Sequence, residues 1–104
     1  MVNTEKKQTF SEIIQGDIPV LVDFYADWCG PCKMMSPVIE QFATEMGAKV
    51  RILKVDVDRN PLVASAYKIQ GIPTIMLFKK GNVLWRESGV VPGHVLRKVI
   101  QPHL

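Results

Sequence analysis

Few cysteines and no long apolar run occur in this sequence, and both shortages limit what the protein can be. Two cysteines among 104 residues are too few for the disulfide framework that holds many small secreted domains together. Nowhere do about 18 apolar residues run together, which excludes a membrane-spanning helix. The 13 Lys and Arg residues, against 10 Asp and Glu, are scattered in short pairs and do not form the basic patch of a nucleic-acid-binding protein.

The composition that is present is that of one ordinary globular domain. Hydrophobic residues make up 47% of the chain and charged residues 22%, a balance that excludes a disordered tail or a fibre. This length has room for one hydrophobic core, so we expect residues 1–104 to form a single domain. The first ten residues hold no apolar core of a signal peptide. We therefore expect a cytoplasmic protein, unless a signal peptide has been removed from an exported form. We also expect a monomer.

The order of the apolar segments predicts an α/β fold. Residues 20–26 form a β-branched and aromatic run without two-residue alternation, as expected of a strand buried on both faces of a sheet. The same patterns predict further strands at residues 50–57, 74–78 and 83–88, and helices at 29–46, at 61–70 with Asn60 as the cap, and from Pro92 onward. The first two strands and the helix between them make a parallel crossover, and residues 79–82 suit a hairpin loop. We expect a mixed central sheet of four or five strands flanked by helices on both faces.

The two cysteines lie three residues apart in the first turn of the predicted helix at residues 29–46. The unpaired N–H groups and the positive dipole end of a helix stabilise a thiolate, which is the reactive form of cysteine. Cys29 is therefore a candidate nucleophile with an accessible sulfur, and Cys32, about one turn further, can form a disulfide with it. Gly30 adds no side chain that would cover Cys29, and Pro31 fits an N-terminal helical position.

Two other uses of such a pair stay open on the residues alone. A CxxC sequence can supply half of a zinc site, but no second pair occurs, and His94 and His103 lie far away near the C-terminus. Two unreactive core cysteines would more naturally sit inside an element than beside Gly-Pro at the start of a helix. The spacing favours a reversible disulfide, and we expect no metal.

The segment around the cysteines, VDFYADWCGPCKM at residues 22–34, resembles the active-site segment of the thioredoxin family. GIPT at residues 71–74 is similar to that family's loop, in which a cis-proline, here Pro73, faces the disulfide, and FKKG at residues 78–81 resembles its hairpin. The resemblance covers roughly residues 10–104. It implies the thioredoxin fold and no cofactor besides the Cys29–Cys32 pair. It also implies that an NADPH-dependent thioredoxin reductase reduces the Cys29–Cys32 disulfide after each reaction.

The resemblance also gives roles to two charged residues. Asp23 stands in an apolar strand, where burial raises the pKa of a carboxyl group that is neither paired nor hydrated. The alternative is that Asp23 is a solvated residue at the end of the strand. The resemblance instead implies that this aspartate, as in thioredoxins, lies behind the cysteines and assists, through water, the deprotonation of the second cysteine. Lys54 matches a lysine near that aspartate, and without the resemblance it would be a solvated strand lysine.

A flat apolar docking patch beside the disulfide is a further implication of the resemblance. Trp28 would border this patch, although a core aromatic is the more frequent use of tryptophan. Ile72, Pro73, Gly89 and Val90 fall where thioredoxins present apolar and backbone groups that pair with an extended substrate segment.

Three departures from the family pattern affect details. The stretch before Phe10 lacks the apolar run of the usual first strand, so we expect that edge strand to be short or absent. Tyr25 stands where many thioredoxins have tryptophan, which keeps an aromatic wall. Ser88 stands before Gly89 where a branched apolar residue is common, and we expect it to alter partner choice without touching the chemistry.

We therefore predict a protein-disulfide reductase, in which the Cys29 thiolate attacks a substrate disulfide and Cys32 resolves the mixed disulfide. Two alternatives stay open: a disulfide oxidase or isomerase of the same fold in an exported compartment, and a redox-inactive binding module. Gly30-Pro31 favours the reducing function, because the rival enzymes tend to carry other residues between the cysteines. We expect neither a nucleic-acid nor a membrane partner.

Overall fold

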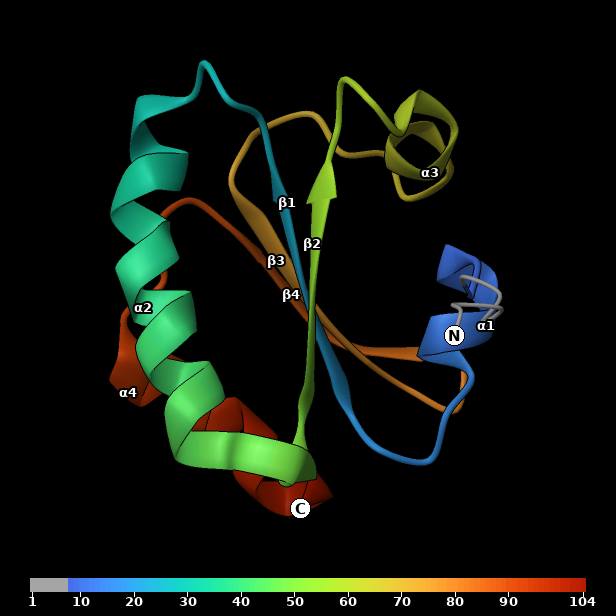
Figure 1. Cartoon of the computed structure of the whole chain (residues 1–104), viewed down its shortest axis with the longest axis vertical. Coiled ribbons are helices and arrows are strands. Elements are labelled where there is room, and N and C mark those ends of the chain that lie inside the picture. Colours follow the sequence, from blue (N-terminus) through green and yellow to red (C-terminus); the bar gives the residue numbers. More distant parts are fainter. Residues whose placement is uncertain (1–7) are drawn as a thin grey trace, which may run out of the picture.

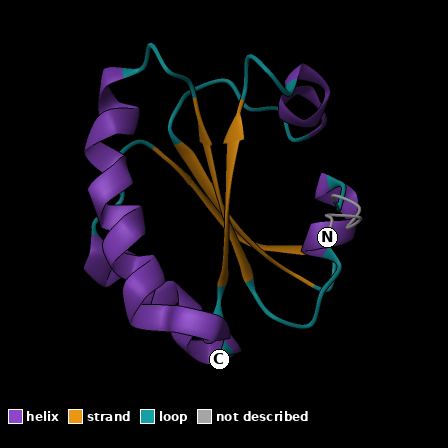
Figure 2. Ribbon diagram, in the orientation of Figure 1, coloured by secondary structure: helices purple, strands orange, loops and turns teal. Residues whose placement is uncertain are grey.

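A computed structural model describes residues 8–104 of the chain. The strands are β1 (Val20–Tyr25), β2 (Arg51–Asp56), β3 (Thr74–Lys79) and β4 (Asn82–Ser88). The helices are α1 (Phe10–Ile14), α2 (Gly30–Met46), α3 (Pro61–Ala66) and α4 (Gly93–Ile100), with short 3-10 turns at Gly47–Lys49 and Gln101–His103. Figure 2 shows the strands crossing the middle of the molecule with helices on either side.

The four strands of the described residues form one mixed sheet in the order β2-β1-β3-β4. β1 pairs with β2 in parallel through the α2 crossover, whereas β3 is antiparallel to both β1 and β4. The predicted hairpin is confirmed, because Lys80 and Gly81 join β3 to β4, both with positive φ. α2 and α4 cover one face of the sheet, and α1 and α3 cover the other (Figure 1). The α/β fold class with helices on both faces is therefore confirmed.

The core is divided by the sheet, and this division decides which way the side chains of β1 point. Leu21 packs with Met35 and Phe42 of α2, whereas Val20 and Val22 pack with Ile14 on the opposite face. Side chains alternate along a strand, so Asp23, two residues after Leu21, faces α2. The strand thus places one carboxyl group on the side of the sheet where α2 and the cysteines lie.

Two local expectations are wrong. α3 ends at Ala66 instead of residue 70, because Lys68 has φ 54°, in the left-handed region that cannot continue a helix. Asn60 is at the N-cap of α3, but its side chain makes no capping bond within the described residues. Its Nδ2 instead donates to the carbonyl oxygen of Asp56 at 3.0 Å. That bond ties the start of α3 to the end of β2.

The expectation for the first edge strand falls largely on residues 1–7, which lie outside the described residues. From Gln8 onward the chain enters α1 directly and forms no strand before β1. Thr9 and Glu12 begin this helix with a capping box, in which each side chain accepts the other residue's backbone N–H.

Truncation of Phe78 will test the face of the core that holds α1. Phe78 is fully buried and meets Phe10 and Tyr67 edge-on, with ring centroids 5.7 and 5.3 Å away. We expect Phe78→Ala to lower the free energy of unfolding by about 3–5 kcal/mol, measured by urea denaturation, because it leaves a cavity. Leu62→Ala, at an exposed position, serves as the control, with a change within about 0.5 kcal/mol. A loss of less than about 1 kcal/mol for Phe78→Ala would contradict this packing.

Candidate active site

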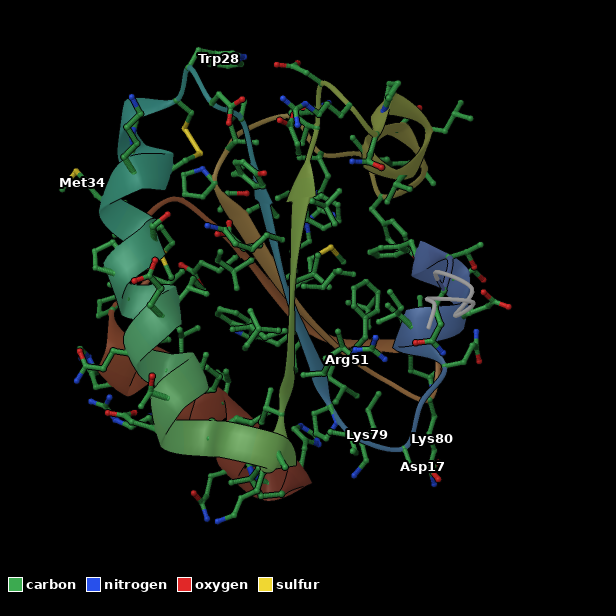
Figure 3. All side chains as sticks on the ribbon, viewed as in Figure 1. Asp17, Trp28, Met34, Arg51, Lys79 and Lys80 are labelled. Atoms are coloured by element: carbon green, nitrogen blue, oxygen red, sulfur yellow. A yellow bond between two sulfur atoms is a disulfide. The ribbon has the colours of Figure 1, made fainter. Side chains whose placement is uncertain are left out.

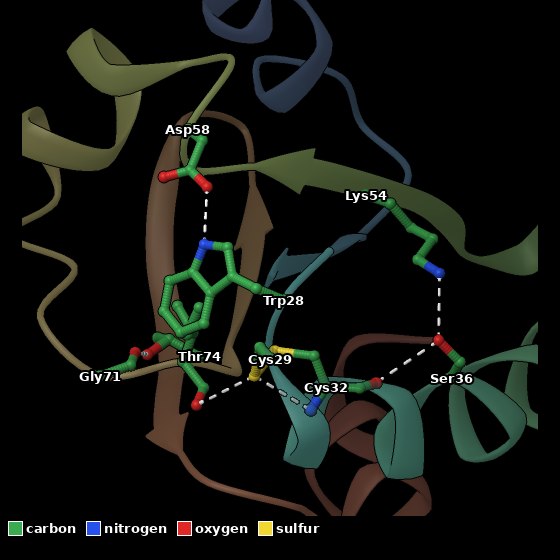
Figure 4. Close-up of a disulfide and its surroundings, with 9 residues drawn as sticks. Trp28, Cys29, Cys32, Ser36, Lys54, Asp58, Gly71 and Thr74 are labelled. Carbon is green, nitrogen blue, oxygen red and sulfur yellow. Dashed lines mark hydrogen bonds between the residues drawn. A yellow bond between two sulfur atoms is a disulfide. The ribbon is translucent and has the colours of Figure 1, made fainter. Parts of the chain in front are cut away.

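The two cysteines form a disulfide at the start of α2, just after the end of β1 (Figure 4). Cys29 is the N-cap of α2, and the backbone N–H of Cys32 donates to its Sγ at 3.2 Å. Pro31 lies in the first turn of the helix, where its missing N–H leaves no bond unmade. The predicted placement of the pair at a helix N-terminus is confirmed, and this end of the helix stabilises negative charge on the Cys29 sulfur.

The sulfur of Cys29 is less accessible than predicted. The side chains of Cys29 and Cys32 are each only 4% exposed. They pack with Ala26, Val57 and Ile72, and the Sγ of Cys29 lies 3.7 Å from the carbonyl oxygen of Ile72. The loop before β3 therefore covers much of the disulfide, and a substrate must approach past the edge of this loop.

Trp28 forms an exposed border of the site and is not a core residue. Its side chain is 71% exposed, and its Nε1 donates to Oδ2 of Asp58 at 2.8 Å. Asp58, which follows β2, fixes the indole beside the disulfide (Figure 4). The sequence interpretation missed this role. The available signal was a polar residue just beyond the carboxyl end of a parallel strand, the edge where sites of open α/β sheets gather.

Asp23 is buried in the middle of the sheet. This position excludes the alternative that Asp23 is a solvated residue at the end of its strand. It is only 1% exposed, and its Oδ1 has no hydrogen-bond partner among the described residues. Desolvation by burial raises the pKa of Asp23 to about 6, and the positive charge of Lys54 opposes that rise. The raised pKa is as predicted, and it lets this carboxyl group exchange a proton near neutral pH.

Lys54 lies opposite Asp23 in the parallel ladder of β1 and β2. Its Nζ donates to the hydroxyl of Ser36 at 3.3 Å and lies 5.2 Å from the centre of the Tyr25 ring. Tyr25 therefore supplies the expected aromatic wall, and the Lys54 ammonium group lies over its ring. A hollow of about 310 Å³ opens beside these groups, lined by Tyr25, Ala26, Asp27, Cys32, Lys33, Ser36 and Lys54. This hollow reaches Cys32 from the solvent.

The loop before β3 faces the disulfide on the other side. The Ile72–Pro73 peptide bond is cis, and the carbonyl oxygen of Pro73 accepts the N–H of Gly89 at 2.8 Å. Gly89 has φ 94°, a conformation that favours glycine. Val90 beside it is exposed. The structure thus brings the Ile72, Pro73 and Gly89 segments together next to Cys29.

Met34 is a second exposed apolar side chain near the cysteines that the sequence interpretation did not single out. It is 65% exposed on the first turns of α2. Trp28 and Met34 lie in the upper part of the molecule, whereas Lys79 and Lys80 lie low on the opposite side (Figure 3). The apolar residues at the cysteine end are thus separated from these basic residues.

Within residues 8–104, no group of three His, Cys, Asp or Glu side chains is placed to hold a metal ion. His94 is the second residue of α4 and lies beside Val38 and Phe42, and His103, in the last 3-10 turn, lies beside Asp17 and Lys49. The two cysteines form a disulfide with each other.

A disulfide at the N-terminus of a helix that follows a central strand, with a cis-proline loop beside it, defines a thiol-disulfide oxidoreductase built on the thioredoxin fold. The thioredoxin family model matches residues 1–102. "Thioredoxin 1" of Nostoc sp. is 45% identical over 93 residues, covering 89% of this chain and 87% of the relative. "Thioredoxin" of Rickettsia felis is 50% identical over 83 residues, covering 79% of each chain.

A solved structure agrees with these relatives. The crystal structure of Malassezia sympodialis thioredoxin superposes with a TM-score of 0.82 at 38% identity, covering 91% of this chain and 86% of that one. The chain belongs to the thioredoxin family. It is a thiol-disulfide oxidoreductase with disulfide reductase activity, and its redox centre is the Cys29–Cys32 pair.

The buried Asp23 gives the protein a characteristic dependence of stability on pH. Its pKa is raised from 3.8 to about 6 in the folded state, so the fold loses stability as pH rises from about 4 to about 6. We expect Asp23→Asn to increase the free energy of unfolding by roughly 3 kcal/mol at pH 8. The gain should vanish below about pH 4, where the wild-type carboxyl group is protonated in both states. Urea denaturation across this range measures the difference, and equal stability at pH 8 would contradict the burial of an ionised carboxylate.

The effect of Lys54 on Asp23 can be measured directly. Because the positive charge of Lys54 lowers the pKa of Asp23, we expect Lys54→Met to raise that pKa above about 6. A pH titration of the Asp23 carboxyl signal by NMR reports the change. Lys98→Met, on α4, is the control that should leave the titration midpoint in place. An unchanged midpoint in Lys54→Met would show that the ammonium does not act on Asp23.

Proposed function

We propose that the protein reduces disulfides of other proteins, with Cys29 as the nucleophile and Cys32 as the resolving cysteine. The observation that supports these roles is the N–H of Cys32 directed at the Sγ of Cys29, at 3.2 Å. In the reduced protein the same N–H and the helix dipole stabilise a thiolate on Cys29. Cys32 lies inside the first turn, so its own sulfur is held behind that of Cys29.

The reaction proceeds by two thiol–disulfide exchanges. First, the Cys29 thiolate attacks one sulfur of the substrate disulfide, forming a mixed disulfide and releasing the other substrate sulfur as a thiolate. Then the Cys32 thiolate attacks the Cys29 sulfur, forming the Cys29–Cys32 disulfide and releasing the second substrate sulfur. Two electrons pass from the cysteine pair to the substrate, and the released thiolates take up protons.

Asp23 accepts the proton of Cys32 before the second exchange. It faces α2 from the centre of the sheet, and its pKa of about 6 makes it a proton acceptor near neutral pH. Lys54 stabilises the ionised carboxylate. The hollow lined by Cys32 and by Lys54, the partner of Asp23 in the ladder, admits the water that passes the proton from the sulfur toward the carboxylate.

The substrate docks as an extended segment beside the cis-proline loop. The exposed indole of Trp28 lies beside the disulfide, and Val90 is exposed next to Gly89. The backbone of Ile72 and the carbonyl of Gly89 supply groups for strand-like pairing, whereas the carbonyl of Pro73 and the N–H of Gly89 bond each other and shape the loop. Gly30 and Pro31 leave the approach to Cys29 open. Because backbone pairing does not depend on the substrate's side chains, this mode of docking admits substrates of different sequence.

An NADPH-dependent thioredoxin reductase returns the pair to its reduced form, and the protein works as a cytoplasmic monomer without a metal or an organic cofactor. Family membership supports the reductase as a partner. Among the described helices, none is long and apolar enough to cross a membrane.

Replacement of each cysteine separates the two roles. We expect Cys29→Ser to reduce insulin disulfides at the background rate of dithiothreitol, because no nucleophile remains. We expect Cys32→Ser to form a mixed disulfide with insulin that persists, because nothing resolves it. Insulin turbidity and mass spectrometry measure these outcomes. Equal rates for wild type and Cys29→Ser would instead indicate a redox-inactive binding module, and a strongly oxidising potential in a redox titration would indicate a disulfide oxidase.

A further inference from the structure

The edge strand β4 holds the segment that leads into the cis-proline loop. Arg86 of β4 donates from Nη1 to the carbonyl oxygen of Tyr67 and from Nη2 to that of Lys68, at 3.0 Å for the latter. Both carbonyls lie just beyond the end of α3, where the chain turns through the positive φ of Lys68 toward β3. One guanidinium group thus bridges two consecutive carbonyls of this turn.

This contact is stronger than an ordinary surface hydrogen bond. Carbonyl groups at the C-terminal end of a helix lack partners within the helix and carry its partial negative charge. The planar, fixed array of donors of Arg86 bonds one of them, the Tyr67 carbonyl at the C-cap, together with the Lys68 carbonyl that follows it. Arg86 therefore fixes the start of the segment that runs from Tyr67 to Thr74.

A second contact from β4 fixes the end of the same segment. The hydroxyl of buried Thr74 donates to the carbonyl oxygen of Gly71, which uses its only proton. The Ser88 hydroxyl, 2.9 Å away, must therefore be the donor to Thr74. The resulting chain of hydrogen bonds runs from Ser88 through Thr74 to Gly71, the residue just before Ile72 and Pro73. Figure 4 shows its last link, between Thr74 and Gly71.

Both contacts come from one face of the strand. Trp85 packs against the core on the side of α2 and α4, so Arg86 faces the opposite side, where α3 lies. Ser88 follows two residues later on the same face, opposite Thr74 in the ladder. β4 thus holds the loop at its start and at its end, and the docking residues Ile72 and Pro73 lie between the two anchors.

We propose that Arg86 and Ser88 are positioning residues that fix the cis-proline loop opposite Cys29 and thereby set the affinity for protein substrates. The proposal rests on the function proposed above, in which an extended substrate pairs with this loop. Neither residue touches the sulfur atoms. A protein substrate depends on the position of the loop, whereas a small disulfide that makes no backbone pairing depends only on Cys29.

The test compares a protein disulfide with a small one. The reduced protein is mixed with insulin or with hydroxyethyl disulfide, and single-turnover rates are measured as the disulfide concentration is varied. We expect Arg86→Met and Ser88→Val to raise the half-saturating insulin concentration about three- to tenfold, as the loss of a hydrogen bond to a fixed loop predicts. The limiting rate with insulin and the rate with hydroxyethyl disulfide should stay within about twofold of wild type.

Two further variants control the experiment. Ser88→Thr keeps the hydroxyl group and should restore insulin binding, whereas Glu87→Gln, between the two residues but on the other face of the strand, should change nothing. Wild-type insulin affinity in both Arg86→Met and Ser88→Val would overturn the proposal, as would an equal loss with both disulfides. If Arg86→Met does not fold, the Ser88→Val and Ser88→Thr pair decides. Failure of the proposed function is separate, because the wild type would then reduce neither disulfide.

Discussion

The N-terminus of α2 directs a backbone N–H at the sulfur of Cys29, and the rest of the site depends on this contact. An anion at this position is stabilised by the unpaired N–H groups and by the helix dipole. This arrangement needs both the buried strand β1 and the amphipathic helix α2. Because α2 begins shortly after β1 ends, its N-cap residue Cys29 lies at the edge of the sheet. The hydrophobic core on both faces of β1 therefore serves the chemistry by fixing one N–H and one sulfur.

Asp23 shows the cost of placing an acid–base group inside such a core. An ionised carboxylate at the centre of the sheet destabilises the fold near neutral pH. Lys54, held by the Ser36 hydroxyl and the Tyr25 ring, reduces this cost without removing it. The balance leaves the pKa at about 6, which suits the role we propose for Asp23, to take a proton from Cys32 and then release it. Stability and proton transfer thus make opposite demands on one residue.

Local sequence signals predicted the strands, the helix at the cysteines and the hairpin, because apolar periodicity, Gly-Pro and short turn segments act over a few residues. The burial of Asp23 could likewise be predicted from its apolar neighbours. The cis bond at Pro73 could not be predicted from the residues alone and came from the family resemblance. Contacts between distant segments were missed: Asp58 binds Trp28, Arg86 binds the carbonyls after α3, and Ser88 binds Thr74. Each depends on which strands become neighbours, and the end of α3 depends on the backbone conformation of Lys68, which no local pattern encodes.

The central claim is that the end of α2 makes the Cys29 sulfur an anion more readily than an ordinary thiol. The most direct measurement is the rate at which iodoacetamide alkylates the reduced protein as a function of pH, with the site of labelling identified by mass spectrometry. The account predicts that Cys29 is labelled first, with a midpoint clearly below the value of about 8.5 of an unperturbed cysteine. Labelling of Cys29 with a midpoint at or above that value, or labelling of Cys32 first, would contradict it.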